Sequence, residues 1–183
     1  MSDPARGGSA APVVRPAELG DVAEILAMVG DLAEYERAAH EVLATHDDLT
    51  HALFGAEPAL FGHVALHPNP AGGRELAGFA LWFLNYSTWL GSHGIYLEDL
   101  YVRNELRGSG FGKSLLQHLA RMCVERDYAR LEWSVLDWNA PAIGFYESLG
   151  AVAQHQWTVH RLTGPALLHL GSIQILSGEA NSA

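Results

Sequence analysis

One glycine-rich stretch, residues 107–112, constrains the fold more than any other part of the sequence; it reads Arg107-Gly108-Ser109-Gly110-Phe111-Gly112. It follows an apolar run that ends in Leu100-Tyr101-Val102 and precedes a segment with apolar residues at helical spacing. Glycines at a helix start expose successive backbone N–H groups, and the helix dipole adds positive charge, so phosphate is the natural ligand. Arg107 and Lys113 can add charge-assisted contacts. The sequence predicts a strand, a phosphate-binding loop and a helix in succession.

The sequence departs from each of two other phosphate-binding motifs at one position. A P-loop requires glycine where Arg107 stands, although Gly112-Lys113-Ser114 matches its end. The dinucleotide fingerprint G-x-G-x-x-G requires a third glycine where Lys113 stands. A plain glycine turn between a strand and a helix remains the alternative on spacing alone.

Length and composition favour one globular domain. The chain has 183 residues, of which 49% are hydrophobic, so we expect a single domain over residues 13–176 between disordered tails at 1–12 and 177–183. A net charge of −10 argues against nucleic-acid and anionic-membrane partners. No apolar stretch approaches the ~20 residues of a membrane-spanning helix. Cys123 is the single cysteine, which excludes an intrachain disulfide and fits the cytoplasm.

Periodicity and turn residues predict the element order β-α-α-β-β-β-α-β-α. A capping box at Thr45 and Asp48 opens the second helix, and Asn139 caps the last one. The segment from Gln156 to Leu162 is strand-like, and that from Ala166 to Leu176 is ambiguous between helix and strand. The strands of the main order are expected at Val13–Arg15, Leu60–Leu66, Leu76–Leu84, Ile95–Val102 and Leu131–Leu136.

The glycine-rich loop resembles the Q/R-x-x-G-x-G/A signature of the GNAT acetyltransferases, with Arg107, Gly110 and Gly112 as the matching letters. Three further stretches, 31–36, 96–102 and 137–146, resemble the diamine (spermidine/spermine) acetyltransferase branch, including its thialysine-acetylating relatives. The resemblance runs from about Val13 to Trp157.

This resemblance implies an α/β (α+β) fold with a splayed, mixed central sheet flanked by helices, with acetyl-CoA in the splay, and a homodimer. The cofactor-binding residues that it implies are Leu100, Tyr101, Val102, Arg107, Gly108, Ser109, Gly110, Phe111, Gly112, Lys113, Asn139 and Ala142.

Amine acetylation requires a proton acceptor, a backbone donor for the carbonyl and a proton donor for the thiolate. By resemblance, Tyr146 is the general acid at the CoA sulfur, although its spacing alone would also suit a core aromatic. Glu98 and Asp99 interrupt an apolar strand, where an unpaired carboxylate is expensive. Strand alternation predicts that they face opposite ways. The resemblance implies that Glu98 deprotonates the amine, and a salt bridge is the alternative for Asp99.

The resemblance also implies an amine pocket shaped by Tyr35, Glu36 and Trp89, together with the two carboxylates of the strand. Aromatic faces and carboxylates suit an ammonium group. The chain departs from the polyamine pattern in having Ser87-Thr88 where that pattern has an aspartate, and Gln154-His155-Gln156 where it is acidic. We therefore expect a small primary amine or an amino-acid side-chain amine.

Ten histidines do not predict a metal site, because His63 and His67 lie near a turn and no H-E-x-x-H occurs. The leading hypothesis is direct acetyl transfer from acetyl-CoA to an amine in a ternary complex. The alternatives are a non-catalytic acyl-CoA-binding or sensing module and, third, a phosphotransferase.

Overall fold

The computed structural model describes residues 12–69 and 72–172. The chain forms two compact units, residues 1–134 and 135–183. The predicted tails lie outside the described residues apart from Pro12. A single domain over residues 13–176 remains a prediction.

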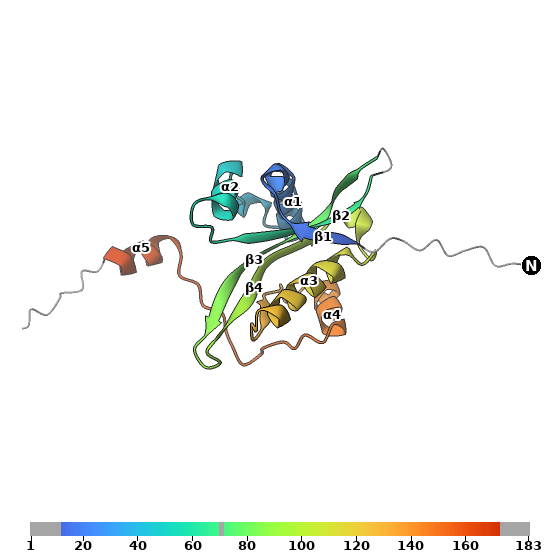
Figure 1. The fold of residues 1–183 in the computed structure, drawn as a ribbon. Coiled ribbons are helices and arrows are strands. Elements are labelled where there is room, and N and C mark those ends of the chain that lie inside the picture. The colour runs from blue at the N-terminus through green and yellow to red at the C-terminus, as the bar shows by residue number, and fades with distance from the viewer. Residues whose placement is uncertain (1–11, 70–71, 173–183) are drawn as a thin grey trace, which may run out of the picture. The chain divides into compact units, whose positions relative to one another are not determined.

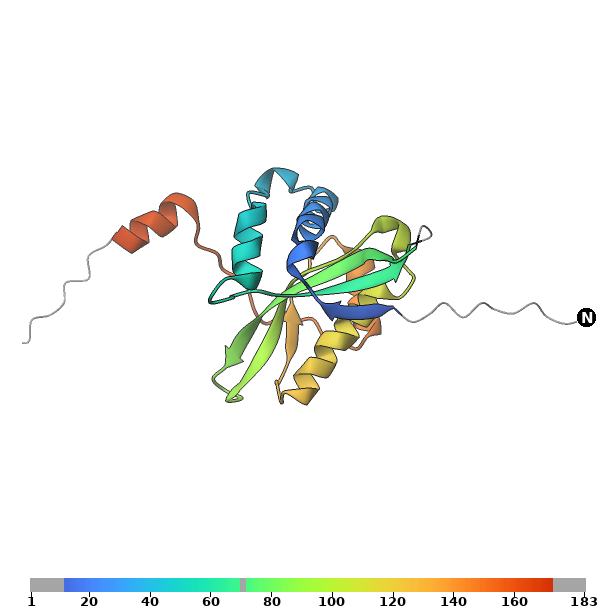
Figure 2. The same cartoon turned by 45° about the horizontal axis from the view of Figure 1, so that its top comes forward.

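The first unit is built on a five-stranded mixed sheet with the strand order β1-β2-β3-β4-β5. Strands β1 to β4 pair antiparallel, and β5 pairs parallel to β4. Helices α1 and α2 cover one face of the sheet and α3 covers the other (Figures 1 and 2). The elements are β1 Val13–Pro16, η1 Leu19–Asp21, α1 Val22–Tyr35, η2 Ala39–Glu41, α2 His46–Phe54, β2 Phe61–Pro68, β3 Arg74–Ser87, β4 Ser92–Val102, η3 Asn104–Leu106, α3 Phe111–Glu125 and β5 Leu131–Trp133.

The core on the α1 side forms because an apolar stripe on that helix meets the inward positions of three strands. Val22, Ile25 and Met28 are fully buried, which is the expected result of apolar spacing at helical period. The predicted capping box at α2 is confirmed: Asp48 N donates to Thr45 Oγ1 at 3.2 Å and Thr45 N donates to Asp48 Oδ2 at 2.9 Å. The whole cluster comprises Val22, Ile25, Met28, Leu49, Leu53, Val64, Leu76, Phe79, Leu81 and Tyr101.

The opposite face buries a histidine between the sheet and α3. Trp82 Nε1 donates to His63 Nδ1 at 3.0 Å, so this ring nitrogen carries no proton. The ring of His118 lies 4.4 Å from that of His63, centroid to centroid. Burial, His118 and Arg126 together lower the pKa of His63 from 6.5 to about 4. This histidine is therefore a neutral core residue.

A β-bulge in β4 sets where the sheet opens. Leu97 pairs with Trp82 and Asp99 pairs with Leu81, so Glu98 is an extra residue opposite β3. The pairing of β4 with β5 stops at Leu97, and β5 ends at Trp133. The prediction of a strand over Leu131–Leu136 was therefore too long, because β4 offers no further partner beyond the bulge.

The second unit contains helices α4, Ala140–Ser148, and α5, Gly164–Ser172. Asn139 caps α4 as predicted, accepting from Ala142 N at 3.3 Å. The predicted strand over Gln156–Leu162 is wrong, because no other strand in the described part of this unit satisfies its backbone groups. The ambiguous segment is helical as far as Ser172, and residues 173–176 lie outside the described part.

The buried histidine predicts an acid-sensitive fold. Protonation is easier in the unfolded chain, where the histidine pKa is 6.5, than in the folded protein, where that of His63 is about 4. The free energy of unfolding should therefore fall as the pH drops from 6.5 toward 4, by about 2 kcal/mol at pH 5. Denaturant unfolding at pH 7 and pH 5 measures this loss.

The matched variant is His63→Gln, which keeps an acceptor for Trp82 Nε1 but cannot titrate. The acid-induced loss of unfolding free energy should be smaller in this variant than in the wild type. The His40→Gln variant, at an exposed histidine, should behave like the wild type. An equal loss in the wild type and His63→Gln would contradict this account.

Candidate functional site

The C-terminal half of β4 is the centre of the candidate site. From Asp99 to Val102 this strand is paired with β3 but not with β5. Paired residues of antiparallel strands point to the same face. Asp99 therefore shares the α1 face with Leu81, whereas regular alternation would have put it on the face of Leu97. The prediction that Glu98 and Asp99 face opposite ways assumed this regular alternation, which the bulge interrupts.

Two neighbouring carboxylates act on Asp99 at this strand. Burial raises the pKa of Asp99 from 3.8 to about 6, and the negative charges of Glu98 and Glu36 act in the same direction. Burial also raises the pKa of Glu36, the C-cap residue of α1. Among the described residues no ion pair involves Asp99, so the salt bridge considered for it is not formed. Such a carboxyl can exchange a proton near neutral pH.

The predicted phosphate loop leads directly into α3. Gly108 and Gly110 have φ values of 77° and 89°, a conformation that strains any residue with a side chain. A Cβ atom on either glycine would meet nothing within 4 Å, so the space in front of the loop is open. No side chain caps α3, which leaves first-turn donors for a ligand. Ser109 and Lys113 are exposed, while Phe111 is buried in the core.

Arg107 links this loop to α1. Its Cζ lies 4.7 Å from the ring centroid of Tyr35 and 5.5 Å from that of Tyr101. Its Nε donates to the Val102 carbonyl at 3.1 Å. The side chain is thus held over the rings by a contact to the end of β4.

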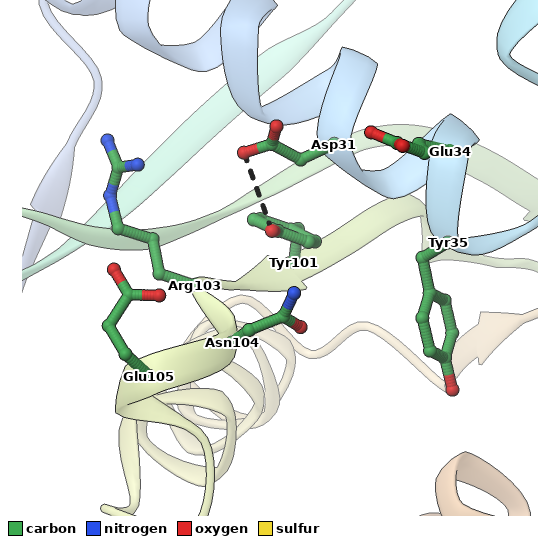
Figure 3. Close-up of a pocket in the computed structure, with 7 residues that line it drawn as sticks. All are labelled: Asp31, Glu34, Tyr35, Tyr101, Arg103, Asn104 and Glu105. Atoms are coloured by element: carbon green, nitrogen blue, oxygen red, sulfur yellow. Dashed lines mark hydrogen bonds between the residues drawn. The ribbon is translucent and has the colours of Figure 1, made fainter.

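A pocket of about 280 Å³ adjoins these rings (Figure 3). Tyr101 donates to Asp31 Oδ2 at 3.5 Å on one wall. Burial and this carboxylate raise the pKa of Tyr101. The walls come from α1, the end of β4 and η3, through Asp31, Glu34, Tyr35, Tyr101, Arg103, Asn104 and Glu105.

The pocket is acidic because its one cationic lining residue is paired elsewhere. Arg103 Nη2 lies 2.6 Å from Glu24 Oε1, and its Nε donates to the Leu76 carbonyl at 2.9 Å. The lining also contains the carboxylates of Asp31, Glu34 and Glu105, which outnumber the one nearby arginine that lies over its rings, Arg107. This arrangement suits a cationic ligand.

The sequence did not single out Asp31, Glu34, Arg103, Asn104 or Glu105 as site residues. Asp31 and Glu34 could have been found from the stretch of residues 31–36 that resembles known enzymes, because this stretch also contains Tyr35. What the stretch could not indicate was that η3 and the end of α1 line one pocket.

Trp89 lies elsewhere in the first unit. It is 86% exposed in the turn between β3 and β4 and does not line the pocket. Glu98 is six residues beyond Ser92, where β4 starts, which corresponds to roughly 20 Å along a strand. A role for Trp89 in amine binding stays a prediction.

The remaining predicted residues belong to the second unit. Asn139 is buried as the cap of α4, and the Ala142 N–H is its hydrogen-bond donor. Tyr146 is half-buried, with its ring centroid 5.3 Å from that of Phe145. Their roles at a cofactor stay predictions.

A mixed sheet that opens beside a bulged strand, followed by a glycine loop on a helix, defines the N-acetyltransferase class of fold. The chain belongs to the acetyltransferase (GNAT) family, whose model matches residues 29–151. The predicted family, fold class and enzyme class are thereby confirmed.

Two curated relatives and one solved structure resemble the chain over most of its length. Thialysine N-epsilon-acetyltransferase of Sus scrofa is 34% identical, covering 88% of this chain and 98% of the relative. L-ornithine N5-acetyltransferase of Arabidopsis thaliana is 32% identical, covering 88% of this chain and 89% of the relative. An integron cassette protein of V. cholerae shares the fold with a TM-score of 0.72 at 23% identity. The match covers 88% of this chain and 98% of that protein's chain.

The raised pKa of Asp99 predicts that its charge lowers stability. Its folded-state pKa of about 6 exceeds its ordinary 3.8, so the stabilisation by the bound proton is lost as the pH rises through 6. Asp99→Asn should therefore raise the free energy of unfolding by about 1–3 kcal/mol at pH 8 and much less at pH 4. Denaturant unfolding at both pH values measures the difference.

Asp127→Asn, at an exposed turn, is the control and should change stability little at either pH. Equal effects of the Asp99 and Asp127 variants at pH 8 would show that Asp99 is not destabilised by its surroundings.

Proposed function

We propose that this protein transfers an acetyl group from acetyl-CoA to a primary amine of a small diamine, polyamine or lysine-like amino acid. The acidic, aromatic pocket beside the phosphate loop carries the proposal, because it brings a site for a cation next to a site for an anion. Both lie at the open end of β4. The relatives named for thialysine and ornithine acetylation support an amino-acid side-chain amine as the acceptor.

The loop of residues 107–113 is suited to hold the pyrophosphate of the acyl donor. Its open space, its left-handed glycines and the uncapped helix behind it support this assignment. The unpaired edge of Leu100, Tyr101 and Val102 offers backbone groups to the pantetheine arm and the acetyl carbonyl. Asn139 and Ala142 complete the cofactor site in the proposal.

The reaction is a direct transfer in a ternary complex. The ammonium group loses a proton to a carboxylate, and the neutral amine attacks the thioester carbonyl carbon. The C–S bond breaks as the N–C bond forms, and Tyr146 gives its hydroxyl proton to the leaving thiolate. The second proton that the acetylated nitrogen must lose restores the Tyr146 hydroxyl, and the carboxylate releases the first proton to solvent. Tyr35, Glu36 and Trp89 are assigned to the acceptor, and Asp31, Glu34 and Glu105 are added to that set because they line the pocket.

Two carboxylates compete for the role of proton acceptor. The resemblance implies Glu98, whereas the pKa of about 6 favours Asp99. A base with that pKa gives kcat/KM values that rise between pH 5 and pH 7. We expect Asp99→Asn to abolish this rise and Glu98→Gln to shift it to lower pH, because the charge of Glu98 contributes to raising the pKa of Asp99.

A pH profile of kcat/KM for each variant decides between them. If Glu98→Gln removes the rise and Asp99→Asn leaves it in place, Glu98 is the proton acceptor and Asp99 only binds the amine.

Release of free CoA is the direct test of the activity. Thialysine, ornithine, putrescine, spermidine and spermine are each incubated with acetyl-CoA and the protein, and CoA is detected with a thiol reagent. Cys123 is buried and burial raises its pKa, so the protein itself contributes little background. We expect the amino-acid amines to give the highest kcat/KM and spermine the lowest.

Tyr146→Phe separates catalysis from binding. Loss of a general acid should lower kcat by about 10²–10⁴-fold with the Kd for CoA unchanged. Tyr128→Phe, a half-buried tyrosine of the first unit, is the control and should retain activity. CoA binding without any amine-dependent CoA release would instead support the alternative of a non-catalytic acyl-CoA-binding module.

Two properties are proposed on resemblance alone, a homodimer and a cytoplasmic location. Light scattering at several protein concentrations tests the first.

In residues 12–69 and 72–172, no helix is long and apolar enough to cross a membrane. In the same residues, no three His, Cys, Asp or Glu side chains are arranged so that they could hold a metal ion. Metal-independent activity remains a prediction, which an assay with a chelator tests.

A further inference from the structure

Arg107 occupies an unexpected position for a residue of a phosphate loop. Its guanidinium carbon is 4.7 Å from the Tyr35 ring centroid and 5.5 Å from that of Tyr101, both within cation–π range. The Tyr35 contact joins the loop to the last residue of α1, far away in the sequence. The guanidinium is therefore directed at the pocket walls.

Two further contacts define this arrangement. The Arg107 Nε donates to Val102 O at 3.1 Å, which fixes the stem of the side chain. The Tyr101 hydroxyl donates to Asp31 on α1 at 3.5 Å, which fixes the second ring. The last turn of α1 contains no basic residue, and the Arg107 guanidinium lies over the ring of its last residue, Tyr35.

We propose that Arg107 is a positioning residue that holds the Tyr35 ring at the pocket wall and thereby determines acceptor affinity. The inference rests on the proposed function, because it takes the pocket to be the acceptor site. In this arrangement, a residue of the glycine-rich loop has a second role besides phosphate binding. Loss of the guanidinium releases the Tyr35 ring and weakens amine binding more than it slows the chemical step.

Arg107→Gln is the decisive variant. The loop signature accepts either Gln or Arg at this position, so the substitution keeps the loop while it removes the cation. We expect the KM for the amine to rise roughly three- to thirtyfold, as for the loss of a cation–π contact, with kcat changed less than the KM. Arg121→Gln, which removes an exposed arginine of α3, should leave both constants unchanged.

A double-mutant cycle tests whether Tyr35 mediates the effect. Tyr35→Leu removes the ring face, and Arg107→Gln should then cause no further rise in the amine KM. Tyr35→Phe keeps the face and should preserve the sensitivity to Arg107→Gln. Additive effects of Tyr35→Leu and Arg107→Gln, or a fall in the amine KM on Arg107→Gln, would overturn the proposal.

A spectroscopic measurement tests the contact without any activity. The Nε–H of Arg107 is hydrogen-bonded, so its ¹H–¹⁵N signal should be observable and shifted by the ring currents of the tyrosines. Tyr35→Leu should move this signal, and Tyr35→Phe should move it less. An unmoved signal in Tyr35→Leu would overturn the contact. A moved signal together with no acetylation of any amine would refute the proposed function and retain the contact.

Discussion

The bulge at Glu98 is the constraint on which the site depends. One extra residue in β4 reverses the face on which the following side chains lie, so that Asp99 and Tyr101 point toward α1. It also coincides with the end of pairing to β5. A single local irregularity therefore opens the sheet for one ligand and turns a carboxylate and a tyrosine toward another.

The charges of the first unit follow this geometry. Uncapped N–H donors at α3 attract an anion on one side of the strand end, and carboxylates from α1 and η3 favour a cation in the adjoining pocket. Arg103 does not cancel the acidic lining because Glu24 pairs with it. Arg107 is part of the glycine-rich loop in the sequence, but its side chain lies over Tyr35 in the wall of the acidic pocket. In the proposed function, the two ligands of the acetyl transfer thus have physically distinct and adjacent binding surfaces.

The sequence predicted the order of the strands and helices because apolar periodicity and caps such as Thr45 are local signals. It also predicted the loop, since glycines at positive φ have few substitutes. The bulge was not predictable, because nothing in residues 97–99 shows how many residues face Leu81 and Trp82 across the sheet. The acidic pocket was missed for a similar reason: Asp31 and Glu105 meet only through tertiary folding. The strand expected at Gln156–Leu162 had the right composition but no partner.

The open edge of β4 also has a consequence for uncontrolled strand addition. An unpaired strand edge can template the addition of a strand from another molecule, and bulges and charges are the usual protection against it. Here the same Glu98 and Asp99 that serve the proposed chemistry interrupt the edge. Neutralising Asp99 removes a buried charge and also one of the two charges in this stretch of the strand. By this reasoning, a charge at this position lowers folding stability while it disfavours the addition of a foreign strand.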